Sequence, residues 1–259
     1  METPQDPNKK QKKSTSEVGN AKNVANFQLL IDAVTGYGTK YKPSRKELEL
    51  TALENMQTTA EDAVSAVIPN KTAWSSKVNA RTIAFSDLQP LATRLLGALD
   101  SAGATKETVE NAKTYNRKLQ GEAAKKTTKP KDPADPDVPE PDKNSISQQS
   151  YDLQIEHFAG IISVLASEPS YAPNEPELQI TALEAKKADL ITTNKAVGTA
   201  YNTVSNSRIA RDKVLYAPEQ GILDISEDVK KYIKSIYGAT SPEYAQVKGI
   251  SFKKPKKKK

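Results

Sequence analysis

The sequence predicts an all-α protein built as a tandem duplication of one antiparallel, four-helix-bundle-like unit. Three observations predict this fold. Apolar residues make up 36% of the chain, with only 4 Phe and 1 Trp, so a core would consist mainly of Leu, Ile, Val and Ala, as in small helical bundles. A long segment also recurs at a fixed spacing, and the segment between the two copies is rich in proline and charge.

The internal repeat is the strongest of these observations. The segment Tyr41 to Glu54 reads YKPSRKELELTALE, and it recurs as Tyr171 to Glu184, YAPNEPELQITALE. At the same spacing, Ala80-Arg81 recurs as Ala210-Arg211. The correspondence spans most of each copy, so we expect two units of the same fold.

The repeat and the composition divide the chain into five segments. Proline recurs among charged residues in the middle segment, which is typical of an extended, semi-rigid spacer. The predicted segments are a basic N-terminal tail (1–20), a first bundle (21–121), a Pro-rich charged linker (122–145), a second bundle (146–250) and a lysine-rich tail (251–259).

Proline, glycine and polar cap residues punctuate each bundle and predict where its helices begin and end. In the first copy the predicted helices are 22–36, 45–68, 70–88, 91–102 and 106–120. In the second copy they are 147–167, 175–197, 199–215, 222–237 and 242–248.

Helix start signals support several of these boundaries. Ser44-x-x-Glu47 and Asn174-x-x-Glu177 have the form of a capping box, in which the first side chain accepts a free backbone N–H. Ser241-Pro242 places a cap residue before a proline at the first helical position. We therefore expect helices to begin at all three places.

Apolar residues at a seven-residue spacing run through the second and third predicted helices of each copy. The positions are Leu53, Ala60, Val67 and Trp74, and then Leu183, Leu190, Val197 and Val204. The spacing stays in phase across Pro69 and Gly198, so each pair of helices is either one long kinked helix or a hairpin. We expect a hairpin.

The composition excludes several classes of function. The chain has no cysteine, which excludes disulfides, thiolate nucleophiles, Cys-ligated zinc and iron–sulfur clusters. No run of about 18 apolar residues occurs and the N-terminus lacks the apolar stretch of a signal peptide, so we expect a cytoplasmic protein without a membrane contact.

A metal or acid–base site is not expected either. His157 is the only histidine, and we interpret it as a partly buried bundle residue rather than a base or ligand, because copy one lacks it. Repeated glutamates at a seven-residue spacing resemble those of di-iron bundles, but such sites also need Glu-x-x-His motifs. We therefore assign no catalytic residue, cofactor or metal ligand.

Two repeated features are candidates for contact with a partner. Tyr41 with Pro43, and Tyr171 with Pro173, lie in loops where aromatic residues often anchor partners, although they also suit the closing of a bundle end. Arg81 and Arg211 lie at equivalent positions of the apolar stripe. They either form a cationic binding site or pair with a carboxylate of the bundle.

Basic residues gather at the ends of the chain. Lys and Arg number 38 against 32 Asp and Glu, and many of them lie in the tails and the linker. The C-terminal run consists of Lys253, Lys254, Lys256, Lys257, Lys258 and Lys259. Such a run either binds the phosphates of a polyanion or only keeps a disordered end soluble.

The motifs also carry a resemblance. The segments Tyr41 to Leu53, Tyr171 to Leu183, Asn206 to Tyr216 and Lys248 to Lys256 resemble those of a bacterial family of two-repeat, all-helical proteins. No function is established for that family. The resemblance therefore implies the repeated helical fold and no activity.

Two hypotheses for function follow. Duplicated bundles joined by a linker favour a noncatalytic protein-interaction or scaffold protein, which binds a protein partner or associates with itself. The alternative is a nucleic-acid-binding or other polyanion-binding protein that acts through its lysine-rich tails. An enzyme that uses Tyr, Arg, Asp or Glu in a groove between helices is less favoured.

Overall fold

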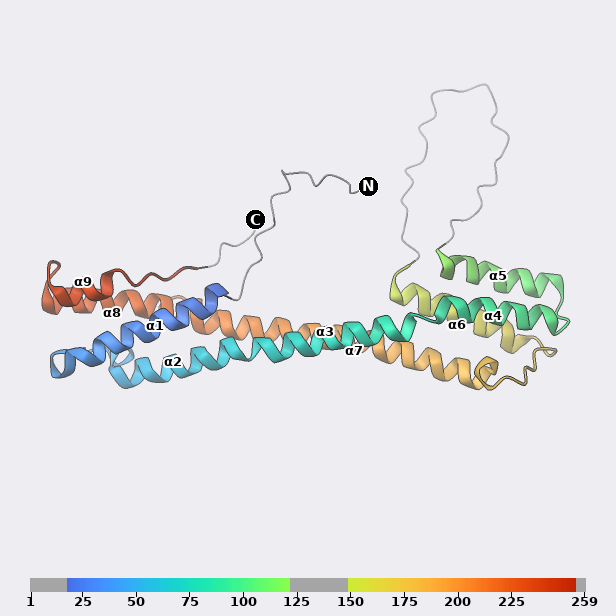
Figure 1. The fold of residues 1–259 in the computed structure, drawn as a ribbon, viewed down its shortest axis with the longest axis horizontal. Helices are drawn as coiled ribbons and strands as arrows, with labels where there is room; N and C mark the ends of the chain where they lie inside the picture. Colours follow the sequence, from blue (N-terminus) through green and yellow to red (C-terminus); the bar gives the residue numbers. More distant parts are fainter. Residues whose placement is uncertain (1–17, 122–148, 255–259) are drawn as a thin grey trace, which may run out of the picture. The chain divides into compact units, whose positions relative to one another are not determined.

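A computed structural model of the protein describes residues 18–121 and 149–254 (Figure 1). Within these ranges all regular structure is helical and no strand occurs, which confirms the all-α prediction. The linker prediction and the lysines from 256 onward lie outside the described residues, as does most of the predicted N-terminal tail.

Nine α-helices and three short 3₁₀-helices make up the described chain. They are α1 (Val18–Tyr37), η1 (Gly38–Lys40), η2 (Lys46–Leu48), α2 (Leu50–Ser65), α3 (Val67–Phe85), α4 (Leu88–Ser101), α5 (Lys106–Gln120), α6 (Tyr151–Ser167), η3 (Pro176–Leu178), α7 (Ile180–Tyr216), α8 (Ile222–Tyr237) and α9 (Pro242–Lys248). The bounds predicted for α5, α8 and α9 are confirmed.

The hairpin expected at Gly198 is wrong, because α7 is one helix of 37 residues that runs through this glycine. A glycine inside a helix costs only about 1 kcal/mol relative to alanine. The apolar stripe before and after Gly198 stays on one face, and Leu190, Val197 and Val204 are all buried. Continued burial of this face offsets the cost, so the chain does not turn.

The first copy does not turn at the equivalent place either. Only Ala66 separates α2 from α3, and its dihedral angles of −61° and −23° are those of a right-handed helix. Pro69 has no N–H to donate to the carbonyl of Ser65, so the ladder of hydrogen bonds is interrupted there. Proline lies in the first turn of α3, where a helix tolerates it.

The two predicted capping boxes are wrong. Ser44 and Asn174 precede the short helices η2 and η3, whose N-cap residues make no side-chain cap bond. The backbone then becomes extended at Glu49 and at Gln179 before the α-helix begins. The prediction for Ser241 is confirmed, because its hydroxyl accepts a hydrogen bond from the N–H of Tyr244 at 3.0 Å.

The described chain forms two compact units that do not follow the two copies of the repeat. Of the described residues, unit 1 comprises 18–72 and 202–254, and unit 2 comprises 73–121 and 149–201. The contacts thus divide the chain differently from the predicted bundles 21–121 and 146–250. Since the chain does not reverse at Ala66 or Gly198, the beginning of each copy packs with the end of the other copy.

Each unit has its own core. In unit 1, α1 packs against α2, α8 and α9 around buried residues that include Phe27, Leu30, Leu53, Val229 and Ile233. In unit 2, α5 packs against α4 and α6 around Leu95, Leu99, Leu119, Phe158 and Ile161. Phe27 and Phe158, which the repeat relates to each other after a shift of one residue, are both fully buried.

Candidate functional site

The repeated tyrosines close their loops. The hydroxyl of Tyr41 donates to the carbonyl of Leu48, and that of Tyr171 donates to the carbonyl of Leu178, each at 2.8 Å. Both rings are buried, and burial raises the pKa of Tyr171 to about 12 and raises that of Tyr41 as well. Inward-facing rings offer little surface to a partner.

The prolines of these two loops differ in burial. Pro43 is buried and Pro173 is half-buried. The predicted partner contact through these two loops stays a prediction, and the geometry gives the tyrosines a role in fixing the loop before α2 and α7.

The two repeated arginines have different partners. Arg211 is buried in unit 1 and donates from Nε and Nη2 to a carboxylate oxygen of its neighbour Asp212, at 2.9 and 2.7 Å. In unit 2, Arg81 donates to the side-chain oxygen of Asn194 at 2.9 Å, and its guanidinium lies 4.0 Å from the centre of the Tyr151 ring. Their surroundings thus differ, and the predicted contact of these arginines with a partner stays a prediction.

His157 lies on α6 and is buried in unit 2. Burial lowers its pKa, and the positive charge of Lys118 lowers it further. In the part of the chain that the structure describes, no group of three or more His, Cys, Asp or Glu side chains is arranged to hold a metal ion.

An apolar groove lies between α2 and the end of α7 in unit 1, with a volume of about 580 Å³. Its first wall consists of Ala52, Asn55, Met56 and Thr59, and its second of Ala210, Lys213, Val214 and Ala217, with Gln220 at one end. Each wall follows the i, i+3, i+4, i+7 pattern of one helix face. Three of the wall residues are alanines, so another backbone can approach closely.

The equivalent place in unit 2 is narrower and charged. The spacing that relates Tyr41 to Tyr171 also relates Met56 to Lys186 and Asp87 to Ala217. In unit 2 the ammonium of Lys186 lies 2.7 and 2.9 Å from the two carboxylate oxygens of Asp87. The remaining cavity there has a volume of about 270 Å³. The cavity of unit 2 is therefore lined by an ion pair, whereas the equivalent groove of unit 1 is open and mainly apolar.

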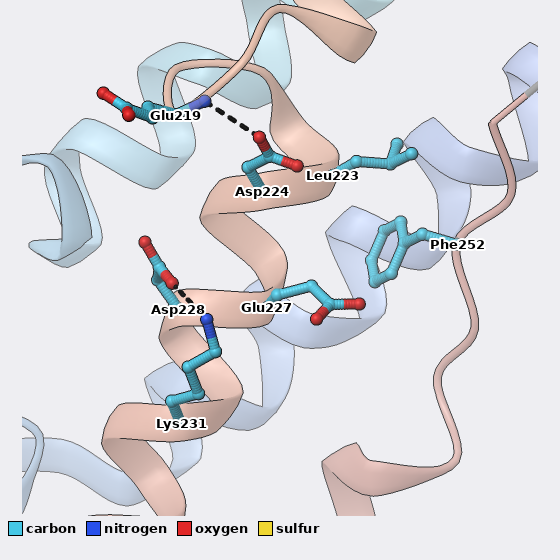
Figure 2. Close-up of a pocket in the computed structure, with 7 residues that line it drawn as sticks. All are labelled: Glu219, Leu223, Asp224, Glu227, Asp228, Lys231 and Phe252. Carbon is cyan, nitrogen blue, oxygen red and sulfur yellow. Dashed lines mark hydrogen bonds and ion pairs between the residues drawn. The ribbon is translucent and has the colours of Figure 1, made fainter.

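An acidic pocket of about 290 Å³ lies beside α8 in unit 1 (Figure 2). Carboxylates of Glu219, Asp224, Glu227 and Asp228 line it together with Leu223, Lys231 and Phe252. Two of the acids already have partners: Asp224 accepts from the backbone N–H of Glu219 at 2.8 Å, and Asp228 is paired with Lys231 and with Arg45.

The segment Ile250–Lys254 that follows α9 is held against α1. The side-chain amide of Asn23 donates to the carbonyl of Lys253 at 2.9 Å and accepts from its N–H at 3.0 Å. Asn26 donates to the carbonyl of Ser251 at 2.7 Å. Lys253 is thus attached to unit 1 through its backbone, and Lys254 through its ammonium, which donates to the carbonyl of Tyr216 at 3.3 Å.

Sequence reasoning missed both the groove and this attachment. The groove depends on which residue stands opposite Met56, and that pairing is not visible before the packing of unit 1 is known. The attachment had a weak signal: Asn20, Asn23 and Asn26 repeat at a spacing of three along α1, which places amide side chains on one face of the helix.

Among the described helices, none is long and apolar enough to cross a membrane. Comparison of the chain with protein-family models, with curated proteins and with solved structures finds no match. The resemblance to a bacterial two-repeat family therefore stays a prediction, and function has to be argued from the geometry of the two units.

Proposed function

We propose that the protein is a noncatalytic interaction protein that holds a helix of a protein partner in the groove of unit 1. The observation that carries this proposal is the difference between equivalent places in the two units. The pair Lys186 and Asp87 spans the cavity of unit 2, whereas Met56 and Ala217 leave the groove of unit 1 open and apolar.

The shape of the groove supports a helix as the bound element. Two helix faces of matching length form its walls, which is the arrangement that receives an amphipathic helix with apolar residues at i, i+3, i+4 and i+7. Small side chains such as Ala52 and Ala210 allow a close approach. Met56 adds a flexible, polarisable surface that adapts to different apolar side chains.

An exchange of the ion pair between the units tests this proposal. Met56→Lys combined with Ala217→Asp introduces into unit 1 the ion pair of unit 2, which should fill the groove and abolish retention of the partner. The matched control is Lys186→Met with Asp87→Ala, which removes the ion pair from unit 2 and should retain the partner.

The experiment uses the full chain as bait in native lysate, with circular dichroism to check that each variant is folded. Loss of one protein from the unit 1 variant alone supports the proposal, and a band of the chain's own mass identifies self-association. Equal recovery by the wild type and both variants contradicts the groove as the binding site.

A second candidate function is polyanion binding through the C-terminal lysines. The observation that favours it is that Lys253 and Lys254 begin this run at a defined, exposed place on unit 1. Binding of a nucleic acid through these lysines should weaken steeply with salt and should be lost when residues 253–259 are removed. Binding that does not depend on salt would exclude this function.

A further inference from the structure

The attachment of Ile250–Lys254 to unit 1 has the features of a bound peptide. The chain has no regular secondary structure after α9, and its backbone is contacted at alternate residues, Ser251 and Lys253, by Asn26 and Asn23. Alternate contacts are what an extended chain presents, since its successive residues face opposite sides.

Asn23 is a buried polar side chain, only 2% exposed, and both its amide nitrogen and its amide oxygen have hydrogen-bond partners. One amide N–H donates to the hydroxyl of Tyr216 at 3.2 Å. The other amide N–H donates to the carbonyl of Lys253, and the amide oxygen accepts from the backbone N–H of Lys253. The Tyr216 hydroxyl in turn donates to the side-chain oxygen of Asn20.

This network fixes the direction of the Asn23 amide. Because the Tyr216 hydroxyl donates its proton to Asn20, its oxygen is an acceptor toward Asn23, which must present an N–H to it. The amide oxygen of Asn23 then faces the position of the Lys253 N–H. The residues that read the peptide backbone are thus oriented by contacts within the folded unit.

The side chains of Ile250 and Phe252 both pack against the core of unit 1. Ser251 and Lys253 are exposed, whereas Phe252 is half-buried, and the ammonium of Lys230 lies 5.0 Å from the centre of its ring. The same ammonium donates to the carbonyl of Ile250. Backbone groups both before and after Phe252 are therefore hydrogen-bonded by side chains of α1 and α8.

The surroundings favour basic peptides. Phe252 forms one wall of the acidic pocket, beside Leu223, and the carboxylate of Glu227 points toward its ring (Figure 2). Carboxylates beside the aromatic position complement lysine or arginine residues next to it. The segment seen in the site has this character, since Phe252 is followed directly by Lys253 and Lys254.

We propose that this face of α1 and α8 is a binding site for extended peptides with an aromatic residue followed by basic residues, and that Ile250–Lys254 occupies it as an intramolecular competitor. The attachment raises the effective concentration of the chain's own segment, so a peptide from a partner binds only at high concentration or once that segment has been displaced. The site is separate from the groove between α2 and α7.

Spin labelling of the full chain tests this proposal. The chain contains no cysteine, so Lys253→Cys provides a single site for a nitroxide on an exposed side chain whose backbone stays in place. An added peptide of residues 249–259 should displace the segment and increase the mobile component of the spectrum. Asn23→Asp, which removes both amide donors, should increase it without any peptide, and Asn26→Ala is the milder variant if the first unfolds.

The matched control is the same peptide with a methyl group on the backbone nitrogen of Lys253. It keeps every side chain and charge but lacks the N–H that Asn23 accepts, so it should require about tenfold higher concentration. A spectrum that the peptide leaves unchanged up to about 10 mM would overturn the proposal, given the effective concentrations of short tethers. Equal potency of the two peptides would overturn it as well.

Discussion

Lys186 and Asp87 form an ion pair across the cavity of unit 2, at the positions that Met56 and Ala217 occupy in unit 1. Two segments of similar sequence thus place equivalent helix positions beside a cavity in each unit, and the residues at these positions differ. The proposed function depends on this difference.

Removal of the ion pair should affect the shape of unit 2 more than its stability. The Asp87 side chain is 62% exposed, and exposed ion pairs contribute at most about 1 kcal/mol. Lys186→Met with Asp87→Ala should therefore lower the free energy of unfolding in urea by less than about 1 kcal/mol. A loss of more than about 2 kcal/mol would show that the pair holds the unit together.

The close approach of α5 and α6 in unit 2 should depend on Gly160. A methyl group on this residue would lie 2.4 Å from ring carbons of Tyr115, well inside van der Waals contact. Gly160→Ala should lower the free energy of unfolding by about 1–3 kcal/mol, because the ring and the helix must shift.

Gly97 on α4 is the matched control, since a methyl group there would meet nothing within 4 Å. Gly97→Ala should raise the free energy of unfolding by about 0.5–1 kcal/mol, because alanine loses less backbone entropy in a helix. If the two variants change stability in the same direction, the packing of Tyr115 on Gly160 is not the determinant. Both are measured by denaturant unfolding of the full chain.

Local features of the sequence predicted most of the helices. The bounds of α5, α8 and α9 follow from signals within a few residues, such as the Ser241 cap and the glycine after α5, whose φ is 81°. The capping boxes predicted at Ser44 and Asn174 also rested on local sequence alone, and they are wrong. In both places the pattern precedes a short 3₁₀-helix, and the backbone becomes extended after that helix, before the α-helix begins.

The arrangement of the units could not be predicted in this way. Whether the chain turns at Gly198 depends on whether continued burial of Val197 and Val204 outweighs the cost of one helical glycine, and this is decided by residues far away in sequence. The candidate sites depend on the same long-range packing: Asn23 is an ordinary polar helix residue until Lys253 is placed beside it.

The repeated tyrosines should contribute equally to their two units. Tyr41→Phe and Tyr171→Phe each remove a 2.8 Å hydrogen bond to a backbone carbonyl and keep the ring. Each variant should lose about 1 kcal/mol of unfolding free energy, and the double variant should lose about the sum, because the two sites lie in different units. Unchanged stability in both single variants would leave the predicted partner contact as the better explanation of these residues.

Stability should fall at alkaline pH, in part through Tyr171. Burial raises the pKa of its phenol from the ordinary value of 10.0 to about 12 in the folded chain. Below about pH 10 the phenol is protonated in both states, so it adds no pH dependence. Above about pH 10 the unfolded chain releases this proton first, so rising pH favours unfolding until the folded phenol also ionises near pH 12.

Unfolding free energies of the wild type and of Tyr171→Phe, measured from about pH 9 to about pH 12, isolate this effect from the titration of lysines, which both chains share. The variant should be less stable below about pH 10 because it lacks the hydrogen bond to Leu178. The difference should shrink above about pH 10 and change sign before about pH 12, because a rise of the pKa from 10.0 to about 12 costs the wild type more than one hydrogen bond contributes. Parallel curves would mean that the phenol of Tyr171 ionises at its ordinary pKa in the folded chain. The hydroxyl would then be reached by water in solution, and the closed loop before α7 would be open for part of the time.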